Sequence, residues 1–145
     1  LYAAAISLGV QMKDTGAAQW IAESFLGLMT PLGADQGVGL WAAVSALTTV
    51  VTNTMSNGAA VAVLGPIVLK MATVAGESPI VLGFITAISS AFAYLTVVGT
   101  PACTIVYASG YLKTTDFLVV GWRMVVMSTI LMMLAASFYW PLLGN

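Results

Sequence analysis

The stretch Thr52-Asn53-Thr54-Met55-Ser56-Asn57-Gly58 interrupts a long hydrophobic run of this sequence with polar and small residues. A second interruption of the same kind, Val98-Gly99-Thr100-Pro101, lies further along the chain. In a lipid bilayer a broken helix leaves backbone polar groups without hydrogen bonds, so such breaks occur only where they face a cavity, an ion or a substrate. The two interruptions therefore predict a binding site.

The composition indicates an integral membrane protein. Of the 145 residues, 60% are hydrophobic and 6% are charged, and the mean hydropathy is +1.01, which is far from the average of soluble domains. The net charge of -1, without clusters of Lys and Arg, argues against a nucleic-acid-binding surface. The sequence has no histidine and one cysteine, Cys103, so it cannot form an internal disulfide and lacks the commonest metal-binding side chain.

Segment lengths predict an all-α polytopic fold, because a helix needs about 20 apolar residues to cross about 30 Å of hydrocarbon. Residues 1–37 are expected to form the end of a transmembrane helix and then an amphipathic interfacial helix over Ala17–Met29. Residues 38–78 contain two apolar arms around a polar tip at 52–58, and the second arm is expected to end at Leu69. Neither arm is long enough to cross alone, so these lengths predict a re-entrant hairpin.

The second half of the chain is expected to contain one broken helix and one complete span. Residues 79–112 predict a transmembrane helix that runs to Val97, is broken at 98–101 and then resumes. Ser and Thr side chains in its first part predict burial against protein and not against lipid. Residues 113–145 predict a final transmembrane helix.

The way in which each helix restarts after its interruption predicts an anion site. Ser56 and Asn57 are strong N-cap residues, and Thr100 followed by Pro101 combines a good N-cap with a favoured first helical residue. A helix N-terminus presents free N–H groups and roughly half a positive charge. Two such ends near the middle of the membrane could hold a carboxylate or a sulfate without any Lys or Arg.

The helices that end at the same interruptions predict a cation site. Unpaired carbonyl groups near Thr52 and near Val98-Gly99, together with the Thr52 hydroxyl, are ligands for a hard cation such as sodium. A cation site beside an anion site is the arrangement that a cotransporter needs, because each bound charge offsets the other in a low dielectric.

At these residues the chain resembles the divalent anion/sodium symporters, a family that moves dicarboxylates, citrate or sulfate. The resemblance covers nearly the whole chain and matches the C-terminal half of that fold. Ser56-Asn57-Gly58 corresponds to the family's Ser-Asn-Thr tip motif, and Gly99-Thr100-Pro101 corresponds to its Gly-Thr-Pro break. Two positions depart from the family pattern: Gly58 replaces the Thr of the tip motif, and Cys103 stands where the family commonly has Asn.

The resemblance implies roles for particular residues and partners. The implied substrate contacts are Ser56, Asn57, Gly58, Thr100 and Pro101. The implied sodium ligands are Thr52, Asn57 and Gly99. The family also implies an N-terminal half of inverted topology that supplies a second hairpin and a second break, a homodimer, an elevator-like transport movement and a bacterial inner (plasma) membrane location. Since the sequence starts inside a hydrophobic segment, we expect it to be a fragment of the transporter.

Other function classes stay open from the sequence alone. Another carrier of the wider ion-transporter group, of the arsenite or sodium/proton type, would keep the broken helices with other ligands. A passive anion channel or a structural membrane subunit is a further alternative, because broken helices also line channel filters. An enzyme is not expected, because no His, Asp or Glu lies near either interruption.

Overall fold

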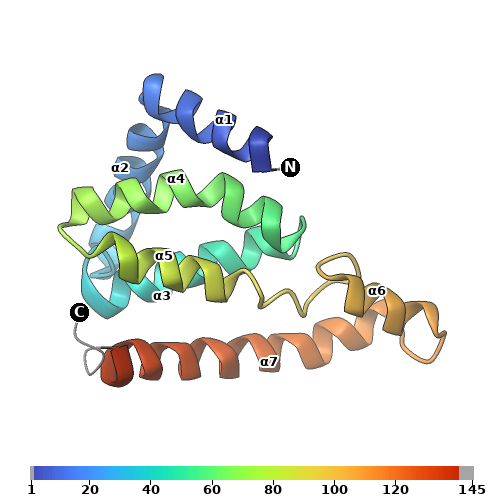
Figure 1. The fold of residues 1–145 in the computed structure, drawn as a ribbon. Coiled ribbons are helices and arrows are strands. Elements are labelled where there is room, and N and C mark those ends of the chain that lie inside the picture. Colours follow the sequence, from blue (N-terminus) through green and yellow to red (C-terminus); the bar gives the residue numbers. More distant parts are fainter. Residues whose placement is uncertain (1, 141–145) are drawn as a thin grey trace.

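The structure, a computed structural model, describes residues 2–140, and all regular secondary structure in that range is helical (Figure 1). The predicted all-α class is therefore confirmed. The elements are α1 (Tyr2–Asp14), α2 (Ala17–Met29), the 3-10 turn η1 (Thr30–Leu32), α3 (Gly37–Thr52), α4 (Asn57–Ala75), α5 (Pro79–Ser89), α6 (Pro101–Ala108), α7 (Thr114–Leu134) and the π-helical turn η2 (Ala135–Tyr139).

Helices α3 and α4 form a helical hairpin whose tip is residues 53–56. Helix α4 packs against α1 and α2 as well as against α3 and α5, and Figure 1 shows α1 and α5 on opposite sides of it. Helix α7 runs along the other side of α3 and α5 and contacts both. The hairpin thus lies inside the helical assembly, while its re-entrant placement in a membrane stays a prediction.

The second arm of the hairpin is longer than the sequence predicted. Helix α4 passes through Leu69 and Lys70 and ends only at Ala75, where Gly76 adopts a left-handed conformation with φ of 73°. Lys is a good helix former, so it does not end the helix, whereas a left-handed glycine does. With 19 residues, α4 is long and apolar enough to cross a membrane by itself, as is α7 with η2, which together have 26 residues. The prediction that neither arm could cross alone is wrong for α4.

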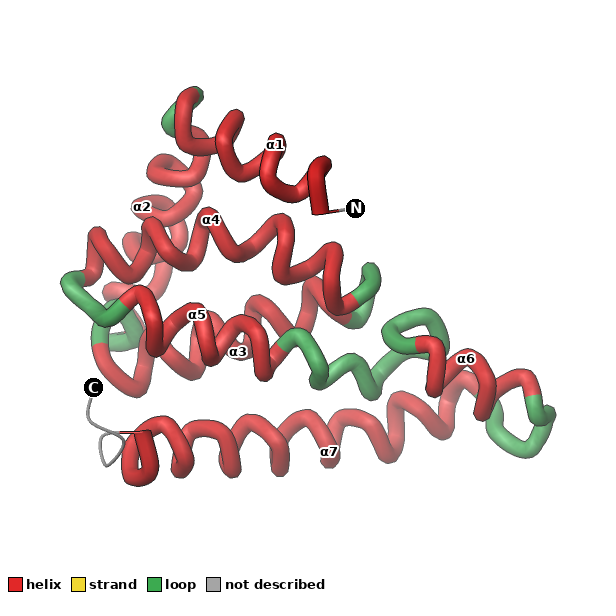
Figure 2. The backbone as a smooth tube through the Cα atoms, viewed as in Figure 1, coloured by secondary structure: helices red, strands yellow, loops and turns green. Residues whose placement is uncertain are grey.

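The second interruption is also longer than predicted. Helix α5 ends at Ser89 and not near Val97, so the segment without regular helix covers residues 90–100 (Figure 2). Its backbone makes hydrogen bonds to the tip of the hairpin, as described below, and these replace the bonds of a continued helix. The predicted final helix corresponds to α7 and η2, but residues 141–145 at its far end lie outside the described part of the chain.

Small hydroxyl side chains form the contact between α3 and α5. Ser45, Thr48, Thr49 and Thr52 lie on one buried face of α3, and Thr86 and Ser89 are buried on α5. The Ser89 hydroxyl donates to the Ser45 hydroxyl across the contact at 2.8 Å. Small residues allow helices in a membrane to approach closely, and the burial predicted for Ser and Thr side chains is confirmed for Thr86, Ser89 and Ser90, whereas Thr96 is half-buried. This polar face of α3 leads directly to the hairpin tip.

Candidate functional site

Asn53 connects the hairpin tip to the second interruption. Its side chain is 5% exposed, and its amide nitrogen donates to the carbonyl of Thr49 at 2.7 Å and to the carbonyl of Phe92 at 3.2 Å. Its side-chain oxygen accepts from the backbone N–H of Leu95 at 2.8 Å. The Thr96 hydroxyl donates to the backbone carbonyl of Asn53 at 2.7 Å. These contacts hold residues 92–96 against the end of α3.

Thr52 and Asn57 face each other across the hairpin tip. The buried Thr52 hydroxyl lies 2.6 Å from the backbone carbonyl of Ser90 and 2.9 Å from the side-chain oxygen of Asn57. A hydroxyl carries one proton, so it can donate to only one of these acceptors at a time. Two of the three predicted sodium ligands are therefore neighbours, and their side-chain oxygens form a pair of the kind that binds hard cations.

Both predicted helix starts are present. Ser56 has extended backbone angles, and its hydroxyl accepts from the backbone N–H of Ala59 at 3.4 Å at the start of α4. The Thr100 hydroxyl accepts from the backbone N–H of Cys103 at 3.3 Å, with Pro101 as the first residue of α6. Each helix consequently begins with N–H groups that have no intrahelical partner and with the positive end of its dipole.

Gly99, the third predicted sodium ligand, is buried inside the second interruption. A Cβ atom at this position would lie 2.9 Å from the Cβ and 3.0 Å from the carbonyl oxygen of Ala93, so the chain can fold back here only with glycine. The Cys103 sulfur lies 3.2 Å from the Thr100 hydroxyl and 3.7 Å from the same Ala93 carbonyl. Cys103 therefore belongs to the packing of the interruption itself.

The structure brings some predicted site residues together and leaves others apart. Thr52 and Asn57 are in direct contact, whereas no hydrogen bond joins Ser56 to Thr100 within residues 2–140. Gly58 and Pro101 are exposed. The links between the two interruptions come instead from Thr52 and Asn53, which bond to the backbone of residues 90–95, and from the Thr96 hydroxyl, which donates to the backbone carbonyl of Asn53.

Asn53 is the residue that the sequence reasoning missed. The sequence did contain a signal for it. Asn53 follows Thr49 by four residues, so it lies on the same side of the helix as the buried hydroxyl residues of α3. The site as a whole contains no Asp, Glu, Lys or Arg in residues 52–58 or 90–104. These two segments attract ions through hydroxyls, amides, backbone groups and helix dipoles.

Residues 2–140 thus combine an uncharged polar tip with a broken helix in an apolar, helical fold, which is the arrangement found in membrane transporters that are built on interrupted helices. The chain belongs to the family described as the sodium:sulfate symporter transmembrane region, which matches residues 1–145. The family resemblance inferred from the sequence is thus confirmed, and the family and the named relatives below are described as transporters and not as enzymes.

Three relatives show how much of a transporter the chain represents. It is 40% identical over 72 residues to the sodium-dependent high-affinity dicarboxylate transporter 3 of Caenorhabditis elegans, which covers 50% of this chain and 13% of that protein. It is 29% identical to an uncharacterized transporter of Synechocystis, over 90% of this chain and 21% of the relative. It is 28% identical to an uncharacterized transporter of Haemophilus influenzae, over 97% of this chain and 30% of the relative. The chain thus spans less than a third of each of these proteins.

Proposed function

We propose that this chain is part of a secondary active transporter that couples the movement of sodium to that of a divalent anion, either a di- or tricarboxylate or sulfate. The observation that carries this proposal is the 2.9 Å contact between the Thr52 and Asn57 oxygens at a tip that is also tied to the second interruption. The family and the sodium-dependent dicarboxylate transporter of Caenorhabditis elegans support the same function.

The anion would bind between the starts of α4 and α6. The residues in contact with it would be Ser56, Asn57, Gly58, Thr100 and Pro101. Each helix start provides free N–H groups and about half a positive charge. Because residues 52–58 and 90–104 contain no Asp or Glu, no carboxylate of these segments competes with an oxyanion for the free N–H groups.

The sodium ion would bind to oxygen atoms of Thr52, Asn57 and Gly99. Hydroxyl, amide and carbonyl oxygens suit a hard monovalent cation and need no carboxylate. Asn57 belongs to both proposed sets of ligands, so the two ions would lie close together. At 4 Å and an effective dielectric constant of about 20, opposite unit charges attract by about 4 kcal/mol, and each ion would therefore strengthen the binding of the other.

The remaining expectations about the whole transporter belong to the same proposal. An N-terminal half of inverted topology would supply a second hairpin and a second break, and two copies of the complete protein would form a homodimer. The site would cross the membrane by an elevator-like movement. The relatives in Synechocystis and Haemophilus influenzae support a bacterial plasma membrane location.

Uptake by the full-length transporter in proteoliposomes tests the proposal. Labelled succinate, citrate and sulfate are each offered under an inward sodium gradient, an inward potassium gradient or an inward proton gradient. We expect accumulation of at least one of these anions above its external concentration only with sodium, and loss of that accumulation when the gradient is dissipated. Equilibration without accumulation under any of the gradients would indicate passive transport, as through a channel, and accumulation driven by protons alone would indicate a carrier of another type.

A further inference from the structure

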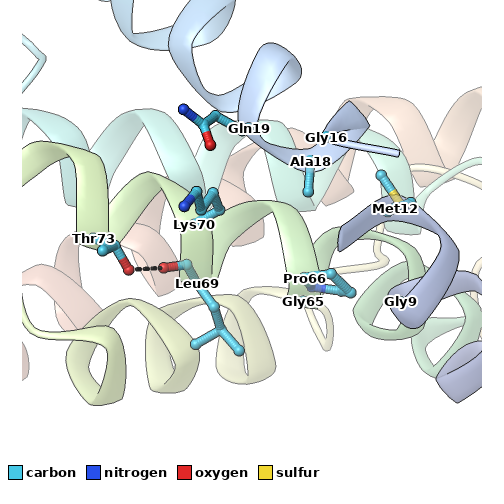
Figure 3. A pocket seen from close by; sticks show the side chains of 10 residues that line it. All are labelled: Gly9, Met12, Gly16, Ala18, Gln19, Gly65, Pro66, Leu69, Lys70 and Thr73. Carbon is cyan, nitrogen blue, oxygen red and sulfur yellow. Dashed lines mark hydrogen bonds between the residues drawn. The ribbon is translucent and has the colours of Figure 1, made fainter. Parts of the chain in front are cut away.

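A pocket of about 520 Å³ lies between α1, α2 and α4, away from the hairpin tip. Figure 3 shows Lys70 and Thr73 of α4 and Gln19 of α2 among the residues that line it. None of the residues proposed for the transport site lines this pocket, so it requires an explanation of its own.

The walls of the pocket are mostly apolar. Met12 of α1 and Pro66 and Leu69 of α4 contribute hydrocarbon surface. The Thr73 hydroxyl donates to the backbone carbonyl of Leu69 at 3.0 Å, so it is already satisfied within the helix. Gly9 permits α1 to approach α4, because a Cβ atom there would lie 3.1 Å from the Pro66 ring. The apolar lining suits a hydrocarbon chain.

Lys70 adds one positive charge to this apolar space. It is partly buried, and the structure shows no ion pair for it among the side chains of residues 2–140 that it describes. Two acidic side chains close in the sequence to lining residues have partners other than Lys70: Glu23 accepts from the Gln19 amide at 2.8 Å, and Glu77 accepts from the backbone N–H of Gly37 at 2.7 Å. A partly buried ammonium without a carboxylate favours an anionic ligand.

The surroundings of Lys70 indicate the level of lipid headgroups. Lys70 lies in the last turns of α4, a helix with the length and hydropathy of a membrane span, where lysines extend toward the interface. On α2, Trp20 is 71% exposed next to Gln19, and exposed Trp side chains are typical of the membrane interface. The pocket therefore combines a cation at the headgroup level with apolar walls, and basic pockets between transmembrane helices bind anionic lipids.

We propose that an anionic phospholipid occupies this pocket, with its phosphate at Lys70 and an acyl chain along Pro66, Leu69 and Met12. The site goes beyond the proposed transport function and does not depend on which anion the protein carries.

Lipid binding to the purified full-length transporter tests this inference. Native mass spectrometry and the thermal unfolding temperature are measured after addition of phosphatidylglycerol or of phosphatidylcholine with the same acyl chains. For the unchanged protein we expect retained phosphatidylglycerol and a higher unfolding temperature than with phosphatidylcholine. Lys70→Gln should lose both effects and Lys70→Arg should keep them. Lys113→Gln, which removes an exposed lysine that does not line the pocket, serves as the control and should also keep them.

A variant that fills the pocket distinguishes the contribution of the cavity to lipid binding from that of the Lys70 charge. Nothing lies within 4 Å of a Cβ atom added at Gly65, so Gly65→Leu can place its side chain in the pocket while Lys70 stays intact. We expect this variant to fold and to lose the retained phospholipid. Retention by Lys70→Gln or by Gly65→Leu equal to that of the unchanged protein would overturn the inference. Equal stabilisation by inorganic phosphate would also overturn it, because the ligand would then be a free anion and not a lipid.

Discussion

The side-chain oxygen of Asn53 accepts a hydrogen bond of 2.8 Å from the backbone N–H of Leu95, and this contact ties the tip of one interrupted helix to the backbone of the other. The amide nitrogen of the same side chain donates to the carbonyl of Phe92. A buried backbone group without a partner is costly. Because α5 ends at Ser89, the Phe92 carbonyl and the Leu95 N–H lack the hydrogen bonds of a continued helix, and the Asn53 side chain replaces them.

Asn53→Ala should destabilise the full-length transporter. The change removes the partners of the Leu95 N–H and of the Phe92 carbonyl, and an unsatisfied buried group costs about 1–3 kcal/mol. We expect a lower thermal unfolding temperature in detergent, measured by tryptophan fluorescence. Thr54→Ala is the matched control, because the exposed Thr54 hydroxyl bonds only to the carbonyl of Val51 in the same turn. Equal unfolding temperatures of the two variants would contradict a structural role for Asn53.

Thr52→Ala should weaken sodium binding. The variant lacks the hydroxyl that lies beside the Asn57 oxygen, so the sodium concentration for half-maximal uptake should rise, whereas Thr52→Ser should restore it. Uptake by proteoliposomes over a range of sodium concentrations measures this value. Thr48→Ala provides the comparison, because its buried hydroxyl bonds only to the carbonyl of Val44 within α3. An unchanged sodium curve for Thr52→Ala would exclude a role of its hydroxyl in sodium binding.

Asn57→Asp should abolish anion uptake. A negative side chain at the start of α4 would repel an anionic substrate and would bind the helix N–H groups in its place. The measurement is the initial rate of sodium-driven uptake, with size-exclusion chromatography as the check that the variant folds. A folded variant with unchanged rate and affinity would count against the proposed substrate site.

Gly121→Ala should loosen the packing of α7 on the second interruption. Gly121 is buried, and a Cβ atom there would collide with the backbone carbonyl of Tyr94. We expect a clear fall in the unfolding temperature. Gly65→Ala is the control on another helix, because its Cβ atom meets nothing within 4 Å, and helix propensity should make it neutral or stabilising by up to about 1 kcal/mol. If both glycines tolerate alanine equally, α7 does not pack on Tyr94 in the transporter.

Features that depend on local chemistry could be predicted from the sequence. The amphipathic spacing of Ala17–Met29 coincides with α2, which starts after Gly16 in a left-handed conformation. The N-caps at Ser56 and Thr100 follow from side chains that bond to the next turn of their own helix. In these cases the residues that allow the prediction also make the predicted contacts, because both lie within one short segment.

Features that depend on distant contacts could not be predicted in this way. Residues 91–97 are largely apolar and contain no glycine or proline, so their pattern favours a helix. The structure ends α5 before them, where Thr52 bonds to the carbonyl of Ser90 and Asn53 bonds to the backbone of Phe92 and Leu95 from the hairpin tip. The predicted end of the second arm at Leu69 is wrong for another reason: the charge of Lys70 favours the end of an apolar run, but a lysine can remain in a helix and extend to the interface.

The joint between the two interruptions uses mainly side chains of the hairpin, and the Thr96 hydroxyl adds a bond from the second interruption to the backbone carbonyl of Asn53. On the hairpin it uses the side chains of Thr52 and Asn53, but on the partner segment those side chains bond to the main-chain atoms of Ser90, Phe92 and Leu95. Substitutions at these last three positions leave the main-chain partners in place. Ser90, Phe92 and Leu95 can thus vary during evolution while the hairpin tip stays attached to the second interruption, whereas a change at Thr96 removes one of the bonds.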